Sequence, residues 1–431
     1  MTILNKHKFI LFLFLTLALS TFSFAQIRIS SPYSRYGIGD LQTVHSVYSS
    51  GMGGLNIALR NPNYINMNNP ASYSSFDTNS FVLDMGIIST FSQLKTNLVT
   101  QEYTNHTSLG HVLLGFPVTR WCGVSLGVIP FSKSGYQVKT SDTIINSDKT
   151  FTERFTGSGG VNQAYLGVSF KPFKNFSFGA NLGYLFGTIN KDRAVERPDD
   201  AYSFNVRVKN DVSVGGIFMN YGLQYQIFLK NDYVLTLGSK FNLPMNVNAK
   251  QTLLAERYSG QEEEDVISIK DTLVNIGEEK GKIYMPLTLG GGLTFAKKNI
   301  WMAGAEFEWQ NWKKFKSFGE SDEIGNSFIV AAGGEYTPKI ASLTSYFKRI
   351  NYRAGFRFSQ SYYELRNSKI NDFSVSIGAG FPLSKTRSTL NFAFEAGRRG
   401  TVGNNLLQEN YFRLVFGISF REFWFFRPKL N

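Results

Sequence analysis

The sequence is poor in the residues that build covalent frameworks and metal centres. Among 431 residues there is one cysteine, Cys122, which excludes a disulfide scaffold and any cysteine-rich zinc or iron–sulfur site. The four histidines show no metal-ligand spacing with cysteine or acidic residues. Beyond residue 25 there is no run of 18 apolar residues and no long segment with helical apolar spacing, so no transmembrane helix is expected.

Glycine and aromatic residues are abundant instead. The chain contains 40 glycines, and 15% of its residues are aromatic, which indicates a large β protein. A hydrophobic content of 42% excludes a mostly disordered chain. The net charge is +13, which in an exported chain favours contact with anionic lipid headgroups over contact with nucleic acid.

The N-terminus has the three parts of a secretory signal peptide. Lys6–Lys8 is basic, residues 9–19 form a short apolar run, and Ser23–Ala25 provides small residues at the cleavage-defining positions. We predict that residues 1–25 are a signal peptide, cleaved after Ala25. The alternative, a membrane anchor, is disfavoured because a helix needs about 20 apolar residues to cross a bilayer.

Apolar residues alternate with small or polar ones along much of the chain. From Phe176 to Tyr184, for example, every even-numbered residue is apolar or aromatic. Because successive side chains of a strand point to opposite faces, such a segment has one apolar face and one small or polar face. About fourteen segments meet this criterion, and most have the roughly 9–11 residues that a tilted strand needs to cross an outer membrane. They span residues 81–91, 107–117, 121–131, 160–170, 174–187, 209–228, 233–246, 283–295, 300–310, 326–337, 351–359, 370–382, 387–397 and 411–421.

The connections between these segments alternate in length. The short turns lie at 119–120, 171–175, 229–232, 296–299 and 383–386. The long polar loops are expected near 132–159, 188–208, 247–282, 311–325 and 398–410. Short turns at one end and long loops at the other are typical of a membrane barrel with an even number of strands. We therefore predict an all-β fold, a transmembrane antiparallel β-barrel of about 14 strands.

A secreted soluble β sandwich or propeller is the alternative, because soluble antiparallel sheets also alternate. Charges on one face of the predicted strands argue against it. Glu306 and Glu308 alternate with apolar neighbours, and Arg353 and Arg357 share the face opposite Phe356. If the apolar face meets lipid, these four charges must line the lumen, where they could contact a ligand.

The sequence offers little catalytic chemistry. Ser108 and His111 could form a hydrolase pair, but no nucleophile elbow or orienting acid accompanies them. The acidic run Glu262–Asp265 lacks the spacing of an EF-hand loop, and Gly290–Gly292 precedes no helix that could hold phosphate. We predict no enzyme activity, no catalytic residue, no metal ligand and no cofactor.

Residues 26–80 do not have the pattern of barrel strands, and about 55 residues of this kind are too few for an independent core. The segment carries a short motif, made of Gly51, Gly53, Gly54, Asn69, Pro70 and Ala71. In this motif the chain resembles the FadL family of long-chain fatty-acid transporters and, more broadly, FadL-like outer-membrane proteins that include PorV-type secretion accessories. The resemblance implies that residues 26–80 are a hatch, or plug, inside the lumen of a fourteen-stranded barrel formed by residues 81–431.

A second feature follows from the same resemblance. FadL transporters release substrate sideways through a gap at a kink in the third strand, and the third predicted strand contains Pro130. Proline cannot donate a ladder hydrogen bond and is disfavoured in an interior strand. Pro130 is therefore the candidate for a lateral gap; the alternative is that it merely ends the strand.

Two functions remain open. The first, which we predict, is passive transport of hydrophobic, fatty-acid-like small molecules across the outer membrane of a Gram-negative cell. The second is a non-transporting accessory role in an outer-membrane secretion or barrel-assembly complex. Both place the protein in the cell outer membrane, with lipid, a hydrophobic small molecule or a larger complex as partners and no nucleic acid.

Overall fold

The computed structural model describes residues 31–42, 46–97, 101–144, 148–197, 203–261, 266–321, 324–383 and 387–423. The predicted signal peptide, the start of the predicted hatch at residues 26–30 and the acidic run at 262–265 therefore lie outside the described residues.

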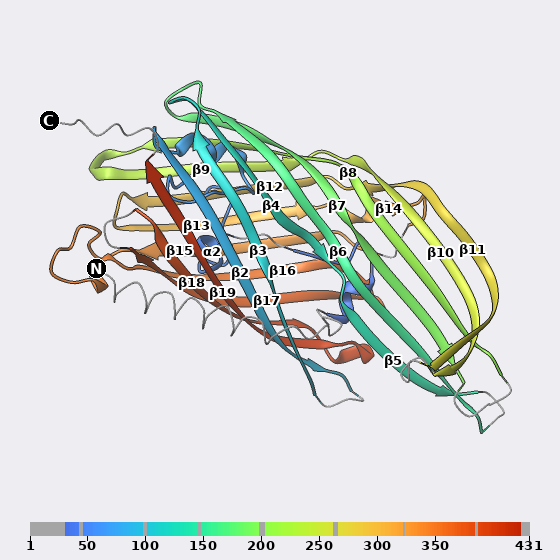
Figure 1. The fold of residues 1–431 in the computed structure, drawn as a ribbon. Helices are drawn as coiled ribbons and strands as arrows, with labels where there is room; N and C mark the ends of the chain where they lie inside the picture. The colour runs from blue at the N-terminus through green and yellow to red at the C-terminus, as the bar shows by residue number, and fades with distance from the viewer. Residues whose placement is uncertain are drawn as a thin grey trace, which may run out of the picture.

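Within the described residues, fourteen strands close into an antiparallel barrel (Figure 1). The ladder between the last and the first of these strands, which runs from Ser80↔Phe423 to Lys95↔Gln408, closes the wall. The barrel strands are β2 (Ser80–Lys95), β3 (Glu102–Pro117), β4 (Cys122–Lys133), β6 (Thr150–Phe170), β7 (Phe176–Glu196), β8 (Asn205–Phe228), β9 (Tyr233–Asn242), β12 (Thr288–Lys297), β13 (Trp301–Gln310), β15 (Ser327–Tyr336), β16 (Asn351–Leu365), β17 (Ser368–Pro382), β18 (Thr389–Gly400) and β19 (Gln408–Phe423). The predicted barrel and its strand number are confirmed.

The outer face of the wall is apolar, as the alternation predicts. In β19, Phe412, Leu414 and Phe416 are 53%, 50% and 42% exposed, whereas Tyr411 and Val415 on the opposite face of the strand are buried. The inward positions of the wall are small, polar or charged. We call the end of the barrel that contains Ser80 and Phe423 the turn end, and the opposite end the loop end.

Several segments expected to be loops are strands. Further strands extend the wall at the loop end: β5 (Tyr136–Thr143), β10 (Met245–Gln261) and β11 (Val266–Met285), and β6 to β8 are also longer than predicted. The predicted loops at 132–159, 188–208 and 247–282 are thus largely wrong. The reason is physical: in β11 both faces meet water from Ser268 to Lys280, so no apolar alternation marks the strand.

The described helices are short. They are η1 (Pro32–Arg35), α2 (Val47–Ser50), η2 (Pro70–Ser75), η3 (Lys230–Asp232), η5 (Trp312–Lys314), η6 (Phe347–Arg349) and η7 (Gly403–Asn405). Among the described residues, no helix has the length and apolar character needed to cross a bilayer.

The N-terminal segment lies against the inner face of the wall on two opposite sides. Helix α2 contacts β17, β18 and β19, whereas η2 contacts β4, β6, β7 and β8. Nearly all residues from 46 to 76 are buried. A segment with this little apolar content is held by the wall rather than by a core of its own.

Glycines on both partners allow the close approach at the first contact. The backbone of Gly53, at a φ of +68°, lies so near β16 that a Cβ on Gly355 would overlap the backbone of Met52 and Gly53. Similarly, a Cβ on Gly378 of β17 would stand 2.9 Å from the Cα of Gly51. Real Cβ atoms cannot occupy such positions, so these glycines are required by packing as well as by φ.

We predict that Gly355→Val destabilises the barrel while Gly291→Val does not. Gly291 is the matched control because it is an exposed strand glycine with nothing within 4 Å of an added Cβ. Overpacking typically lowers the free energy of unfolding by about 1–3 kcal/mol. Because the added side chain of Gly355→Val would meet backbone atoms, we expect a loss at or above the upper end of this range. Urea unfolding in detergent, followed by tryptophan fluorescence, measures the difference; equal stabilities for the two variants would contradict this packing.

Candidate functional site

Asn69 joins the N-terminal segment to the wall through hydrogen bonds. Its side chain is fully buried, and its Nδ2 donates hydrogen bonds to the carbonyl oxygens of Ile57 (2.6 Å), Leu223 (3.2 Å) and Ser239 (3.1 Å). The Oδ1 accepts from the Ala71 N–H at 3.2 Å and caps η2, whose first residue is Pro70. One amide therefore joins two parts of the segment to strands β8 and β9.

Arg60 is an anchor that the sequence analysis missed. Its guanidinium donates to the Ala71 carbonyl (2.9 Å) and to the side chains of Ser74 (2.9 Å), Ser177 (2.9 Å) and Gln224 (3.1 Å). Burial lowers the pKa of Arg60 to about 10, which leaves the group charged at neutral pH. The available signal was a lone cation in a stretch of asparagine and proline, ten residues before the Pro70 turn.

The two predicted lumen acids both bind groups of the protein itself. The Glu306 Oε2 accepts the backbone N–H groups of Asn56 at 2.7 Å and Ile57 at 2.8 Å. Glu308 forms an ion pair with Lys240 at 2.6 Å. Both acids lie on the inner face of β13, as the alternation predicts, and Glu306 holds the N-terminal segment.

Arg353 is enclosed. Its side chain is 0% exposed; its Nε pairs with Glu335 at 2.8 Å and its Nη1 donates to the Asn391 Oδ1 at 2.8 Å. Its Nη2 donates to the Tyr64 hydroxyl at 3.2 Å, and the guanidinium lies 4.4 Å from the centre of the Tyr48 ring. This residue therefore links three wall strands to the N-terminal segment.

Arg357 pairs with Glu395 at 2.5 Å, and Glu395 also faces Arg413 at 3.5 Å. The structure thus places Arg353, Arg357 and both predicted acids on the lumen side, each with a partner in the protein. Contact of these charges with a ligand remains a prediction.

A buried aromatic cluster closes the lumen toward the loop end. The rings of Trp312 and Tyr362 lie 4.7 Å apart, and those of Tyr362 and Tyr363 lie 4.3 Å apart. Both tyrosine hydroxyls donate to the Gly39 carbonyl, at 2.5 and 3.2 Å. The same apolar cluster includes Leu185 and other residues of β6, β7, β8, β10 and β11, so it bridges different sides of the wall.

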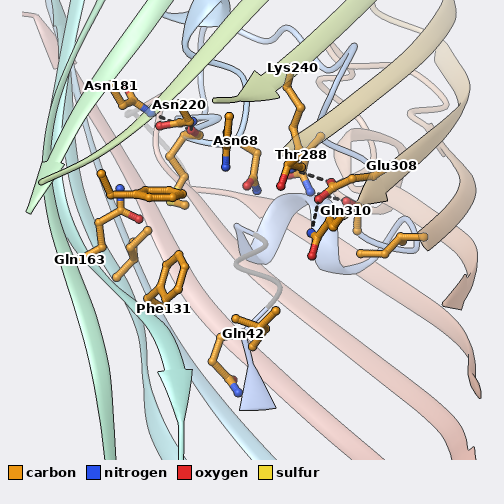
Figure 2. Close-up of a pocket in the computed structure, with 18 of the residues that line it drawn as sticks. Gln42, Asn68, Phe131, Gln163, Asn181, Asn220, Lys240, Thr288, Glu308 and Gln310 are labelled. Carbon is orange, nitrogen blue, oxygen red and sulfur yellow. Dashed lines mark hydrogen bonds and ion pairs between the residues drawn. The ribbon is translucent and has the colours of Figure 1, made fainter. Parts of the chain in front are cut away.

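Between this cluster and the N-terminal segment lies a cavity of about 150 Å³. Figure 2 shows amides of neighbouring strands on one side, an ion pair with its polar neighbours on the other, and an amide of the N-terminal segment between them. The residues so placed are Asn181 and Asn220; Lys240, Thr288, Glu308 and Gln310; and Asn68. Apolar side chains such as Ile129, Phe131 and Phe218 complete the lining, which is therefore mixed in character.

Pro130 lies inside a strand and not at its end, because β4 continues to Lys133. The register of β4 with β6 shifts between Pro130 and Ser132. The ladder between β3 and β4 runs only from Pro117↔Gly123 to Val112↔Val128, so the loop-end part of β3 pairs with β2 alone. The wall therefore has a local break beside Pro130, which does not end the strand, while the use of this break as a lateral gap remains a prediction.

The N-terminal segment covers the edge of β4 that β3 leaves. The short strand β1 (Asp40–Leu41) pairs with Lys133 and Ser132, and Gln42 donates its N–H to the Phe131 carbonyl at 2.9 Å. Figure 1 shows β3 and β5 diverging toward the loop end beside this stretch.

Ser108 and His111 do not meet as a hydrolase pair. Ser108 accepts a hydrogen bond from the Lys133 ammonium, whereas the Nε2 of His111 lies 3.0 Å from Asp84 in a buried pair. Among the described residues there is no group of three or more His, Cys, Asp or Glu that could hold a metal ion.

We predict that Arg353→Met costs about 3–5 kcal/mol in unfolding free energy, because Glu335 is then buried without its partner. The double variant Arg353→Met/Glu335→Met should recover part of this loss. As a control, Arg193→Met removes the exposed pair with Glu153 and should cost less than about 1 kcal/mol. Urea titrations of the refolded proteins test this, and equal losses for the two arginine variants would contradict it.

Solved structures with a similar fold include a FadL homologue and two toluene transporters. A Pseudomonas aeruginosa FadL homologue aligns with a TM-score of 0.59 and 13% identity, over 90% of this chain and 100% of that chain. The Ralstonia pickettii toluene transporter TbuX aligns with a TM-score of 0.56 and 14% identity, over 90% and 99%. The Pseudomonas putida toluene transporter TodX gives 0.55 and 15%, over 90% and 99%. At these identities the likeness establishes the fold, and it confirms the FadL-like architecture that the sequence motif suggested.

No curated protein sequence matches the chain. The sequence matches the BamG family from residue 6 to residue 431, which is nearly the whole chain. With its FadL-like barrel and internally anchored N-terminal segment, the protein belongs to the BamG family.

Proposed function

We propose that this protein is an outer-membrane barrel that acts as a non-transporting subunit of a larger membrane assembly. The apolar outer face supports the membrane location, because hydrocarbon favours such side chains and a closed barrel satisfies the backbone. In this role residues 31–80 act as a permanent plug that stiffens the wall.

The observation that carries the proposal is the double closure of the lumen. The N-terminal segment crosses the lumen at one level through its contacts with Glu306 and Arg353. The aromatic cluster around Tyr362, which includes Tyr33 and Ile38 of the same segment, crosses it at another. A channel would have to break both sets of contacts in each cycle of opening. A structural subunit keeps them intact.

The chemistry of the cavity between the two closures supports the same conclusion. Passage of a hydrocarbon requires a continuous apolar path. Here the lining is mixed: apolar side chains such as Phe131 are interrupted by the amides of Asn181 and Asn220 and by the Lys240–Glu308 ion pair. A hydrocarbon displacing water there would leave buried polar groups unsatisfied, at about 1–3 kcal/mol for each group.

We therefore expect the protein to leave native membranes within an assembly larger than itself. A tagged chain extracted in mild detergent should elute well ahead of the same chain refolded alone, with a constant set of partner proteins across detergents. Elution at the size of the refolded monomer would contradict the subunit role.

Passive transport of hydrophobic small molecules is the second candidate. It is supported by the missing β3–β4 pairing beside Pro130 and by the fold shared with solved toluene transporters. Substrate would leave the lumen sideways through this stretch of the wall.

Uptake assays separate the two candidates. The subunit role predicts that deleting the gene leaves entry of radiolabelled oleate and toluene within about 2-fold of the parent, since the lumen carries no flux. Transport predicts a several-fold fall that the natural chain restores and a Pro130→Val variant does not. Assembly of other outer-membrane proteins in the same strains serves as the control for indirect damage.

A further inference from the structure

Strand β11 has an edge without a neighbour in the described part of the chain. Along one edge it pairs with β10 from Met285 to Val266. Along the other edge its pairing is confined to Ile283 and Tyr284, which meet β14 (Lys316–Ser317). The stretch from Ile267 to Gly281 is therefore a long edge strand whose outward backbone groups have no strand partner.

This edge stands beyond the apolar belt. Both faces of β11 are exposed from Ser268 to Lys280, whereas β10 behind it still buries Ala255 and Tyr258. In Figure 1, β10 and β11 form the long hairpin that curves along the outside of the loop end. The charged residues of this stretch, such as Lys270, Asp271 and Glu278, disfavour contact with hydrocarbon and indicate that the edge faces water.

Large aliphatic side chains are exposed on the same stretch. Ile269 is 52% exposed, and Leu273, Val274 and Ile276 are 43%, 38% and 43% exposed. Exposed apolar side chains on a free edge strand form a template for pairing with another chain. Native edges are protected by proline, charged side chains, bulges or a covering element. The stretch contains no proline, and its protection is limited to charged side chains such as Lys270 and Lys280 and the three register shifts of its ladder with β10.

We propose that β11 binds an extended segment of a partner protein, which adds to the sheet as a further antiparallel or parallel strand. An extended backbone is the occupant because only it repeats donors and acceptors at the spacing of a strand edge. The aliphatic side chains supply pockets for alternate side chains of that segment. Opposite charges side by side, Lys270 and Asp271, leave no strong preference for a charged ligand.

Strand β11 already has the extended conformation that strand pairing requires. Strand β10 holds β11 extended through a long ladder that is interrupted by three register shifts, and Lys250 of β10 pairs with Glu278 of β11 at 2.6 Å. A partner segment therefore loses its own conformational freedom on binding, while β11 loses little. This inference rests on the proposed subunit function, since it names the surface through which the barrel meets its partner.

Hydrogen–deuterium exchange on the native assembly tests the proposal. The probe is the assembly purified in mild detergent, compared with the same chain refolded alone. Amides of β11 between Ser268 and Ile276 should exchange at least about 10-fold more slowly in the assembly. Unchanged exchange across this stretch, in an assembly that is larger than the monomer, overturns the inference and leaves the subunit role standing. A native protein that is monomeric instead overturns the subunit role itself.

A pair of variants gives a second, independent readout. Ile269→Lys/Leu273→Lys adds charge to the free edge and should lower the amount of partner retained by about 10-fold. Tyr103→Lys is the control, because Tyr103 is 73% exposed on β3 at the same end of the barrel. Unchanged electrophoretic mobility of the unboiled proteins verifies folding. Full retention of the partner by the double variant overturns the inference.

Discussion

The structure depends on direct contact between two backbones, that of the N-terminal segment and that of the barrel wall. This contact is possible only where both lack a Cβ or where the side chain is a small amide. On one side Gly51 and Gly53 meet Gly378 and Gly355 of the wall, and on the other the Asn69 side chain lies against Gly222. Because such close packing leaves no free space between the two backbones, the wall and the segment fix each other's position.

The buried charges of the lumen also join the N-terminal segment to the wall. The lumen contains buried arginines and acids that would be costly in a hydrocarbon environment, and each one discussed above is paired or hydrogen-bonded within the protein. Arg353 and Glu306 therefore hold the N-terminal segment in place. These charges already bind groups of the protein, so few polar groups of the lumen are available to a substrate. The closed lumen therefore favours a subunit role over transport.

The two ends of the barrel differ in what they offer a partner. At the turn end most connections are short, and residues 337–350 between β15 and β16 are the longer exception in the described part of the chain. At the loop end β10 and β11 rise beyond the apolar belt, and β11 stands there with one edge open. The sequence predicts a loop here because the side chains meet water on both faces, so the alternation that marks the membrane strands is lost. Backbone pairing still forms there, since a neighbouring strand supplies it whatever the side chains are.

The sequence by itself determined which face of each membrane strand looks outward. The period of two that places Phe412 and Leu414 toward lipid also places Glu306 and Arg353 in the lumen, because alternation is a local property of the extended backbone. The same pattern determined the number of barrel strands. Only the tertiary structure decided what each lumen group binds: Glu306 meets Asn56 and Ile57 across about 250 positions of sequence. Such pairs are set by how the closed wall and the segment inside it fit together, and no local pattern contains that information.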